Sequence, residues 1–176
     1  MRRAGFTLVE QVAVAAIVIA LACIAAPALG HLVARSRLQV AQSDIMAALQ
    51  QARALALQTR RRSMLCPTRD GRQCTDDVHW EGGWLIGHYR GDQADQLNGP
   101  PTRTDGGHVR LNIISTAGRR RIRFQPDGTA GGSNATFTAC RIGEAEGALA
   151  VTVSNAGRIQ GARASAALAH RCANGG

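Results

Sequence analysis

The chain has 176 residues, of which 45% are hydrophobic and 3% aromatic, and 21 basic residues against 12 acidic ones give a net charge of +9. The hydrophobic share excludes a disordered chain, and the 20 glycines lack the period of a collagen-like protein. The length suits one modest domain. Every basic residue is an arginine, whose planar, permanently charged side chain suits carboxylate or phosphate partners.

An uncharged apolar segment covers residues 12–30. A helix of this length spans about 28 Å, close to the roughly 30 Å hydrocarbon core of a bilayer. Arg2 and Arg3 precede the segment, which predicts a cytoplasmic N-terminus and a periplasmic remainder. A secretory signal peptide, cut near Ala26-Pro27-Ala28, shares this layout and is the alternative.

Glu10 lies at the start of the apolar segment, directly after Gly5-Phe6-Thr7-Leu8-Val9. A carboxylate in lipid costs up to about 3.5 kcal/mol and is tolerated when an ammonium group pairs with it. The GFTLVE sequence resembles the prepilin peptidase site of type IV pilins and type II secretion pseudopilins. The resemblance implies cleavage after Gly5 by prepilin peptidase, N-methylation of Phe6, and pairing of Glu10 with the terminal amine of a neighbouring subunit. It also matches Pro27 to a proline of the family's membrane helix, where the missing N–H is expected to loosen or kink the helix.

Apolar residues continue at spacings of three and four beyond this segment, which predicts one long helix over about 6–60. They are Leu38, Ala41, Ile45, Ala48, Leu49, Ala52, Leu55 and Ala56. We interpret this stripe as packing against the protein's own sheet. Lateral packing in a filament is the alternative.

After residue 62 the sequence changes to short β-like runs separated by turn residues such as Pro126-Asp127-Gly128. The expected strands are 63–66, 84–90, 109–115, 120–125, 135–142, 148–153 and 158–160. A helix followed by strands predicts an α+β fold with a mainly antiparallel sheet. The expected organisation is a leader over 1–5, a membrane helix over 6–34, an amphipathic helix over 35–62 and a periplasmic β-rich head over 63–176.

Four of the five cysteines lie outside the apolar segment, at Cys66, Cys74, Cys140 and Cys172. Of the three pairings that four cysteines permit, we favour Cys66 with Cys74, which closes a local loop, and Cys140 with Cys172, which ties down the tail. Disulfides agree with a periplasmic head. A zinc site is the alternative, but the sequence has no Cys-x-x-Cys pair.

The head carries four further motifs, which are LCPTRDGRQC, Gly83-Trp84-Leu85, RFQPDGT at 123–129 and VTVSNAGR at 151–158. With the leader they resemble the GspH/FimT family of minor pilins and pseudopilins over nearly the whole chain. The resemblance implies the type IV pilin fold and a structural role among other pilins, in a priming or tip complex of a type IV pilus or type II secretion pseudopilus in the bacterial inner membrane. A periplasmic protein with a single anchor and no filament role is the alternative.

Some FimT-like members bind DNA during natural transformation through a C-terminal Gly-Arg-x-Arg. The corresponding residues here are Gly157, Arg158, Ile159 and Gln160, so the second arginine is absent. Other arginines that could contact DNA are Arg163, Arg171, Arg119, Arg120, Arg121 and Arg123. The positive charge favours polyanions through counterion release, while plain solvation and acidic protein partners are the alternatives.

The sequence has no Gly-rich phosphate loop, no H-E-x-x-H and no G-x-S-x-G, so we expect neither catalysis nor a cofactor. A calcium loop around residues 70–77 lacks oxygen ligands at alternating positions, so no metal is expected either.

Overall fold

The computed structural model describes residues 8–108 and 110–176, which divide into two compact units, one up to Arg37 and one from Leu38 onwards. Helix α1 (Leu8–Thr59) starts in the first unit and ends in the second. The helix ends at Thr59 because Arg60 has a left-handed backbone, with φ of 52°, that an α-helix does not accommodate. The expected helix over 6–60 is therefore confirmed from Leu8 onwards, whereas Gly5 and Phe6 lie outside the described residues.

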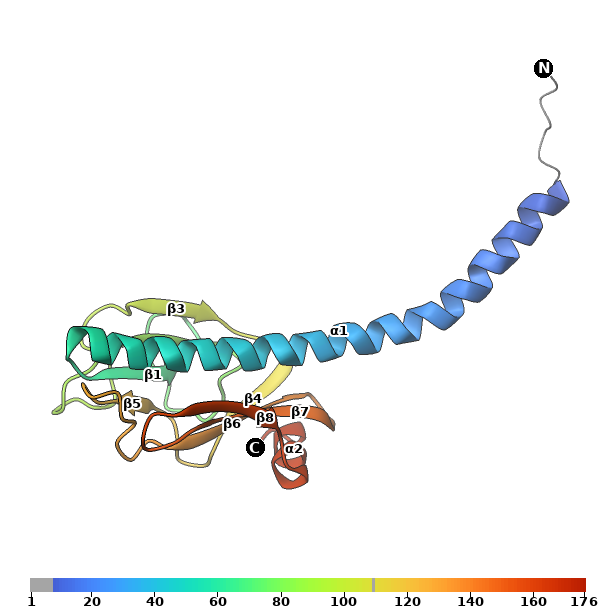
Figure 1. Ribbon diagram of the computed structural model, residues 1–176. Coiled ribbons are helices and arrows are strands. Elements are labelled where there is room, and N and C mark those ends of the chain that lie inside the picture. The colour runs from blue at the N-terminus through green and yellow to red at the C-terminus, as the bar shows by residue number, and fades with distance from the viewer. Residues whose placement is uncertain (1–7, 109) are drawn as a thin grey trace, which may run out of the picture. The chain divides into compact units, whose positions relative to one another are not determined.

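The second unit contains two antiparallel sheets, rather than the single sheet expected (Figure 1). One has the order β3-β2-β1-β5 and consists of β1 (Ser63–Pro67), β2 (Gly83–His88), β3 (Arg103–Gly106) and β5 (Ile122–Phe124). The other has the order β4-β6-β7-β8 and consists of β4 (Leu111–Ser115), β6 (Ala135–Arg141), β7 (Glu144–Val153) and β8 (Ile159–Arg163). Each strand pair described in the two sheets is antiparallel, as expected.

The core lies between the second half of α1 and the two sheets. Seven of the eight stripe residues on α1 are buried, and Leu55 is partly buried against them. They join side chains from both sheets, such as Leu65 of β1 and Phe137 of β6, in one cluster. Trp80 adds an edge-to-face contact with Phe137 at a centroid distance of 4.9 Å. Packing of the stripe on the protein's own sheets is thus confirmed.

Two polar side chains attach α1 to the backbone of the head. The Gln42 amide donates to the carbonyl oxygens of Ala150 and Ala162, both at 2.9 Å. Arg53 Nε donates to the carbonyl of Gly128 at 2.9 Å.

Gly157 lies against the same Gly128 carbonyl, and a Cβ at this position, with φ of 77°, would come within 2.1 Å of it. Only glycine therefore fits where this turn meets the Gly128 turn.

Seven strands lie close to their expected positions, with two larger differences. Strand β7 begins at Glu144 rather than at residue 148, because Ile142 and Gly143 make a tight turn that pairs Arg141 with Glu144. Strand β4 begins at Leu111 rather than at the expected residue 109, which lies outside the described residues.

Two elements were missed, namely β3 and the C-terminal helix α2 (Ala166–Ala173). Strand β3 is short, mostly exposed and polar, so it carries no hydrophobic alternation. Helix α2 had a readable signal, because Ser165 caps its first turn by accepting from the Leu168 N–H.

The structure contains both favoured disulfides. Cys66 on β1 is bonded to Cys74, eight residues later, and Cys140 on β6 is bonded to Cys172 on α2. The second bond attaches α2 to the sheet. Cys23 is a free, exposed cysteine on α1.

Candidate functional site

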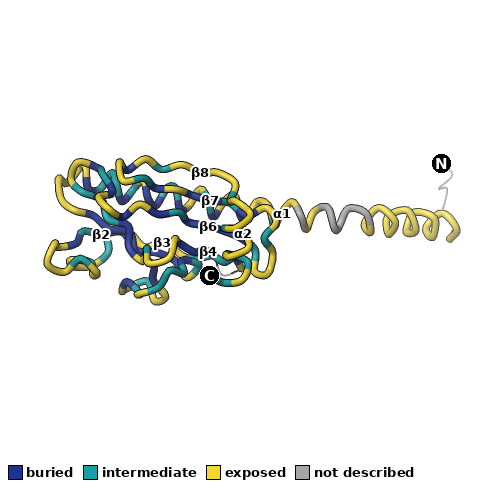
Figure 2. Tube along the Cα trace, turned by 90° about the horizontal axis from the view of Figure 1, so that it is seen from below, coloured by how far each residue is buried: buried dark blue, intermediate teal, exposed yellow. Residues whose placement is uncertain are grey.

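The N-terminal part of α1 exposes large apolar side chains. Figure 2 marks the described residues at its N-terminal end as exposed. Ile17, Val18 and Ile19 are consecutive, and their exposed fractions are 61%, 58% and 63%. Because successive helical residues are about 100° apart, these three side chains point in different directions. A helix that is apolar all round needs to be covered by protein or lipid.

Among the described residues, no helix carries a stretch both long and apolar enough to cross a membrane. The membrane-spanning segment expected within residues 12–30 is not confirmed by this finding.

Glu10 lies in the first turn of α1. The positive end of the helix dipole favours a carboxylate at this position. Helix α1 includes Pro27. The loosening or kink expected at this residue stays a prediction. The cleavage site before Phe6 lies outside the described residues.

The second candidate region is the arginine run that leads into β5. Arg119 donates to the Gly132 carbonyl at 2.9 Å and to Asn134 Oδ1 at 3.2 Å. Arg120 is half exposed and pairs with Asp76 at 2.7 Å.

Arg121 and Arg123 reach the loop between β2 and β3. Arg123 pairs with Asp95 at 2.8 Å and donates to the Ala94 carbonyl. Arg121 donates to the Asp95 carbonyl at 2.7 Å, and its side chain is only 5% exposed. Burial lowers the pKa of the Arg121 guanidinium, and the nearby carboxylates of Asp76 and Asp95 oppose this effect. Arg121 is therefore part of the head's interior rather than a free surface charge.

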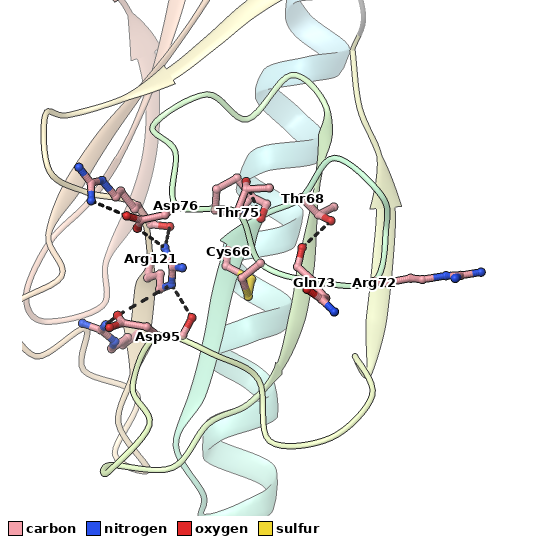
Figure 3. Close-up of a disulfide and its surroundings, with 12 residues drawn as sticks. Cys66, Thr68, Arg72, Gln73, Thr75, Asp76, Asp95 and Arg121 are labelled. Carbon is pink, nitrogen blue, oxygen red and sulfur yellow. Dashed lines mark hydrogen bonds and ion pairs between the residues drawn. A yellow bond between two sulfur atoms is a disulfide. The ribbon is translucent and has the colours of Figure 1, made fainter.

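These side chains surround a polar cavity of about 320 Å³. It is lined by Asp76, Asp95, Gly118, Arg119, Arg120, Arg121, Arg123, Gly131, Gly132 and Ser133. In Figure 3 the Arg121 side chain lies between Asp76 and Asp95, whereas Arg72 points away from them. The structure thus brings the predicted arginines of 119–123 together with two acidic residues that sequence reasoning did not connect with them.

The remaining predicted arginines lie on three other elements. Arg158 follows the Gly157 turn, Arg163 ends β8 and Arg171 lies on α2. All three are exposed, and within the described residues no ion pair involves their side chains. DNA binding through these residues stays a prediction.

Comparisons with known proteins agree with this architecture. The family model of the type II transport protein GspH matches residues 41–157. Two crystal structures of the type IV minor pilin FimU of Pseudomonas aeruginosa (strain PAO1) are similar to this chain, each with 26% sequence identity. One covers 76% of this chain and 92% of its own with a TM-score of 0.60, and the other covers 73% and 94% with a TM-score of 0.57. No curated protein matches the chain at a significant level.

The long helix packed on antiparallel sheets is the fold of a type IV pilin, and it places this protein among the minor pilins and pseudopilins. The chain belongs to the GspH family, whose model matches most of the head and the second half of α1. The family is one of structural subunits that assemble with other pilins.

Proposed function

We propose that the chain is made with a leader that prepilin peptidase removes after Gly5, and that Phe6 then becomes the N-methylated first residue. In this proposal the first part of α1 holds the subunit in the bacterial inner membrane, with the head in the periplasm, until it packs into a filament core. The observation that carries the proposal is the ring of exposed apolar side chains around α1, from Leu8 to Val33. The head buries its own stripe on the sheets, so the first part of the helix is left to contact other molecules.

Glu10 has a specific role in this proposal. Once covered by apolar neighbours, its carboxylate is costly unless a positive group pairs with it. The amine created by cleavage before Phe6 on a neighbouring subunit is such a group. This pairing would set the position of each new subunit along the filament.

Replacing Glu10 tests the proposal. We expect Glu10→Gln to reduce incorporation into sheared filaments by about tenfold or more. Removing one partner of a buried ion pair costs several kcal/mol, because the other charge is left unpaired. Immunoblots of filament and membrane fractions measure this ratio. Glu146→Gln is the matched control, because Glu146 is an exposed carboxylate of the head. Normal assembly of the Glu10 variant would contradict the proposal, as would a mature protein that does not begin at Phe6.

The host machine is either a type IV pilus or a type II secretion pseudopilus. The family description names type II transport, whereas the two matched structures are of a type IV minor pilin. A null strain that loses protein secretion would indicate the pseudopilus, and one that loses pili would indicate the pilus.

A further inference from the structure

The cavity beside β5 contains a buried positive charge that is only partly neutralised. Arg121 Nη1 lies 3.3 Å from an Asp76 oxygen, and Arg121 Nε lies 3.9 Å from Asp95 Oδ1. Both carboxylates make shorter ion pairs elsewhere, Asp76 with Arg120 at 2.7 Å and Asp95 with Arg123 at 2.8 Å. A buried charge needs close partners to offset its lost hydration. Arg121 Nε also donates to the Asp95 carbonyl at 2.7 Å, but Arg121 shares both of its carboxylates with other arginines. A further anion would therefore still be attracted to it.

The rim of the cavity is accessible to such an anion. The Asp76 and Asp95 side chains are 68% and 79% exposed, so they lie on the outside of the arginine cluster. Gly118 and Gly132 line the cavity, and an added Cβ at either would meet no atom within 4 Å. The cavity thus has an open rim and a buried guanidinium inside.

The lining charges favour a carboxylate ligand. Four guanidinium groups face two carboxylates, which leaves the cavity positive. Asp76 already shows the preferred geometry, because its two oxygens contact Arg120 and Arg121. A DNA duplex holds its phosphates in a rigid row that would have to pass both exposed aspartates, whereas a flexible acidic segment can place a single carboxylate side chain between them.

We propose that this cavity binds carboxylate side chains of an acidic protein segment, which would contact Arg119, Arg120 and Arg121. The chemistry of the site is independent of the filament role. Only the source of the segment, a neighbouring pilin subunit, rests on the proposed function.

A binding assay with labelled hexaglutamate and the full chain in detergent tests this proposal. We expect the double variant Arg119→Gln/Arg120→Gln to weaken binding about tenfold or more in fluorescence anisotropy at about 0.15 M salt, since charge-assisted pairs are lost. Arg121 is kept, because removing a buried charge would change folding as well. Circular dichroism checks that the variant is folded.

The matched control is Arg61→Gln/Arg72→Gln, which removes the same charge from exposed positions outside the cavity. Binding by this control should stay within about twofold of the parent, because exposed charges are largely screened. Equal loss in both variants, or no hexaglutamate binding by the parent, would overturn the proposal. A labelled DNA duplex that binds through Arg119 and Arg120 when hexaglutamate does not would identify a nucleic-acid site instead.

The assay separates this proposal from the filament role. Peptide binding requires no cleavage, no membrane and no other subunit. Normal assembly of the Glu10 variant with intact peptide binding would therefore contradict only the proposed function. Reduced assembly of that variant, with no hexaglutamate binding by the parent, would contradict only the cavity proposal.

Discussion

Three aspartates in turns accept hydrogen bonds that keep them ionised. Asp70 accepts from the N–H groups of Gln73 and Arg72 at 3.0 and 2.8 Å, and these bonds lower its pKa below 3.8. Asp127 accepts from the N–H and the hydroxyl of Thr129, which also lowers its pKa. Burial alone would raise the pKa of Asp77, but bonds from His79, Arg69 and Val78 bring it below its usual value. The folded state thus stabilises the ionised form of all three carboxyl groups.

We expect acid to destabilise the head through these three groups. Their pKa is lower when folded than when unfolded, so the unfolded state binds more protons at low pH. The stabilisation is fully present above the unfolded pKa, near 3.8, and is lost as the pH falls through the lower folded pKa. Urea unfolding between about pH 2 and 6 measures this slope. The variant Asp70→Asn/Asp127→Asn should have a shallower slope, and an unchanged slope would show that other groups control acid stability.

At the scale of elements, the two disulfides differ in what they connect. The Cys66–Cys74 bond joins residues eight apart beside β1. Within this loop the Thr68 hydroxyl already donates to the Gln73 carbonyl and accepts from the Gly71 N–H. The Cys140–Cys172 bond closes 32 residues and joins α2 to β6. Helix α2 has further attachment through Asn112 on β4, whose amide donates to the Cys172 carbonyl at 2.9 Å. Loss of the Cys140–Cys172 bond should therefore destabilise the head more than loss of the Cys66–Cys74 bond.

We expect Cys140→Ala/Cys172→Ala to lower the free energy of unfolding by about 3 to 4 kcal/mol, and Cys66→Ala/Cys74→Ala by about 2 to 3 kcal/mol. The reason is that closing a longer loop removes more entropy from the unfolded chain. Urea titrations of both double variants under oxidising conditions provide the comparison. A larger loss for the shorter loop would show that native contacts, rather than loop entropy, decide the order.

At the scale of the whole molecule, α1 performs two tasks with one continuous backbone. From Leu38 onwards its apolar stripe is buried against both sheets, and the residues between the stripe positions are half-buried or exposed. Before that point the large apolar side chains that the structure describes are exposed. The head is consequently stabilised by the second half of α1, and the first half remains available for other contacts.

Leu49→Ala tests the contribution of the stripe. Leu49 is fully buried in the core cluster. We expect the substitution to lower the free energy of unfolding by about 2 to 5 kcal/mol, because it removes buried apolar atoms and leaves a cavity. Val40→Ala is the control, because Val40 is 49% exposed and should cost about 0.5 kcal/mol or less. Urea denaturation of the full chain measures the free energy of unfolding of both variants. Unfolding is monitored by the near-ultraviolet circular dichroism of Trp80 and Trp84, which are buried. Similar losses for the two variants would contradict a core centred on the stripe.

Local patterns determine much of this architecture. The spacing of Leu38, Ala41 and Ile45 predicts the buried helix face, because a 3.6-residue repeat places such residues on one side. Strands are predicted from alternating or continuous apolar residues, because successive side chains of a strand point to opposite faces. The polar strand β3 lacks this pattern. Helix α2 was missed although Ser165 marks its start, because its alanines give only a weak apolar pattern.

By itself, the sequence predicted the long helix and the strands other than β3, and it favoured the two disulfide pairings that the structure contains. The pilin-like leader and the role of Glu10 stay predictions. Only the tertiary structure decided which arginines form ion pairs within the head and which remain exposed without one among the described residues. Arg121 has Asp76 and Asp95 as neighbours, yet these are 45 and 26 residues away in the chain. Periodicity reports which face of a helix or strand is apolar, but ion pairs between distant loops depend on how the sheets fold together.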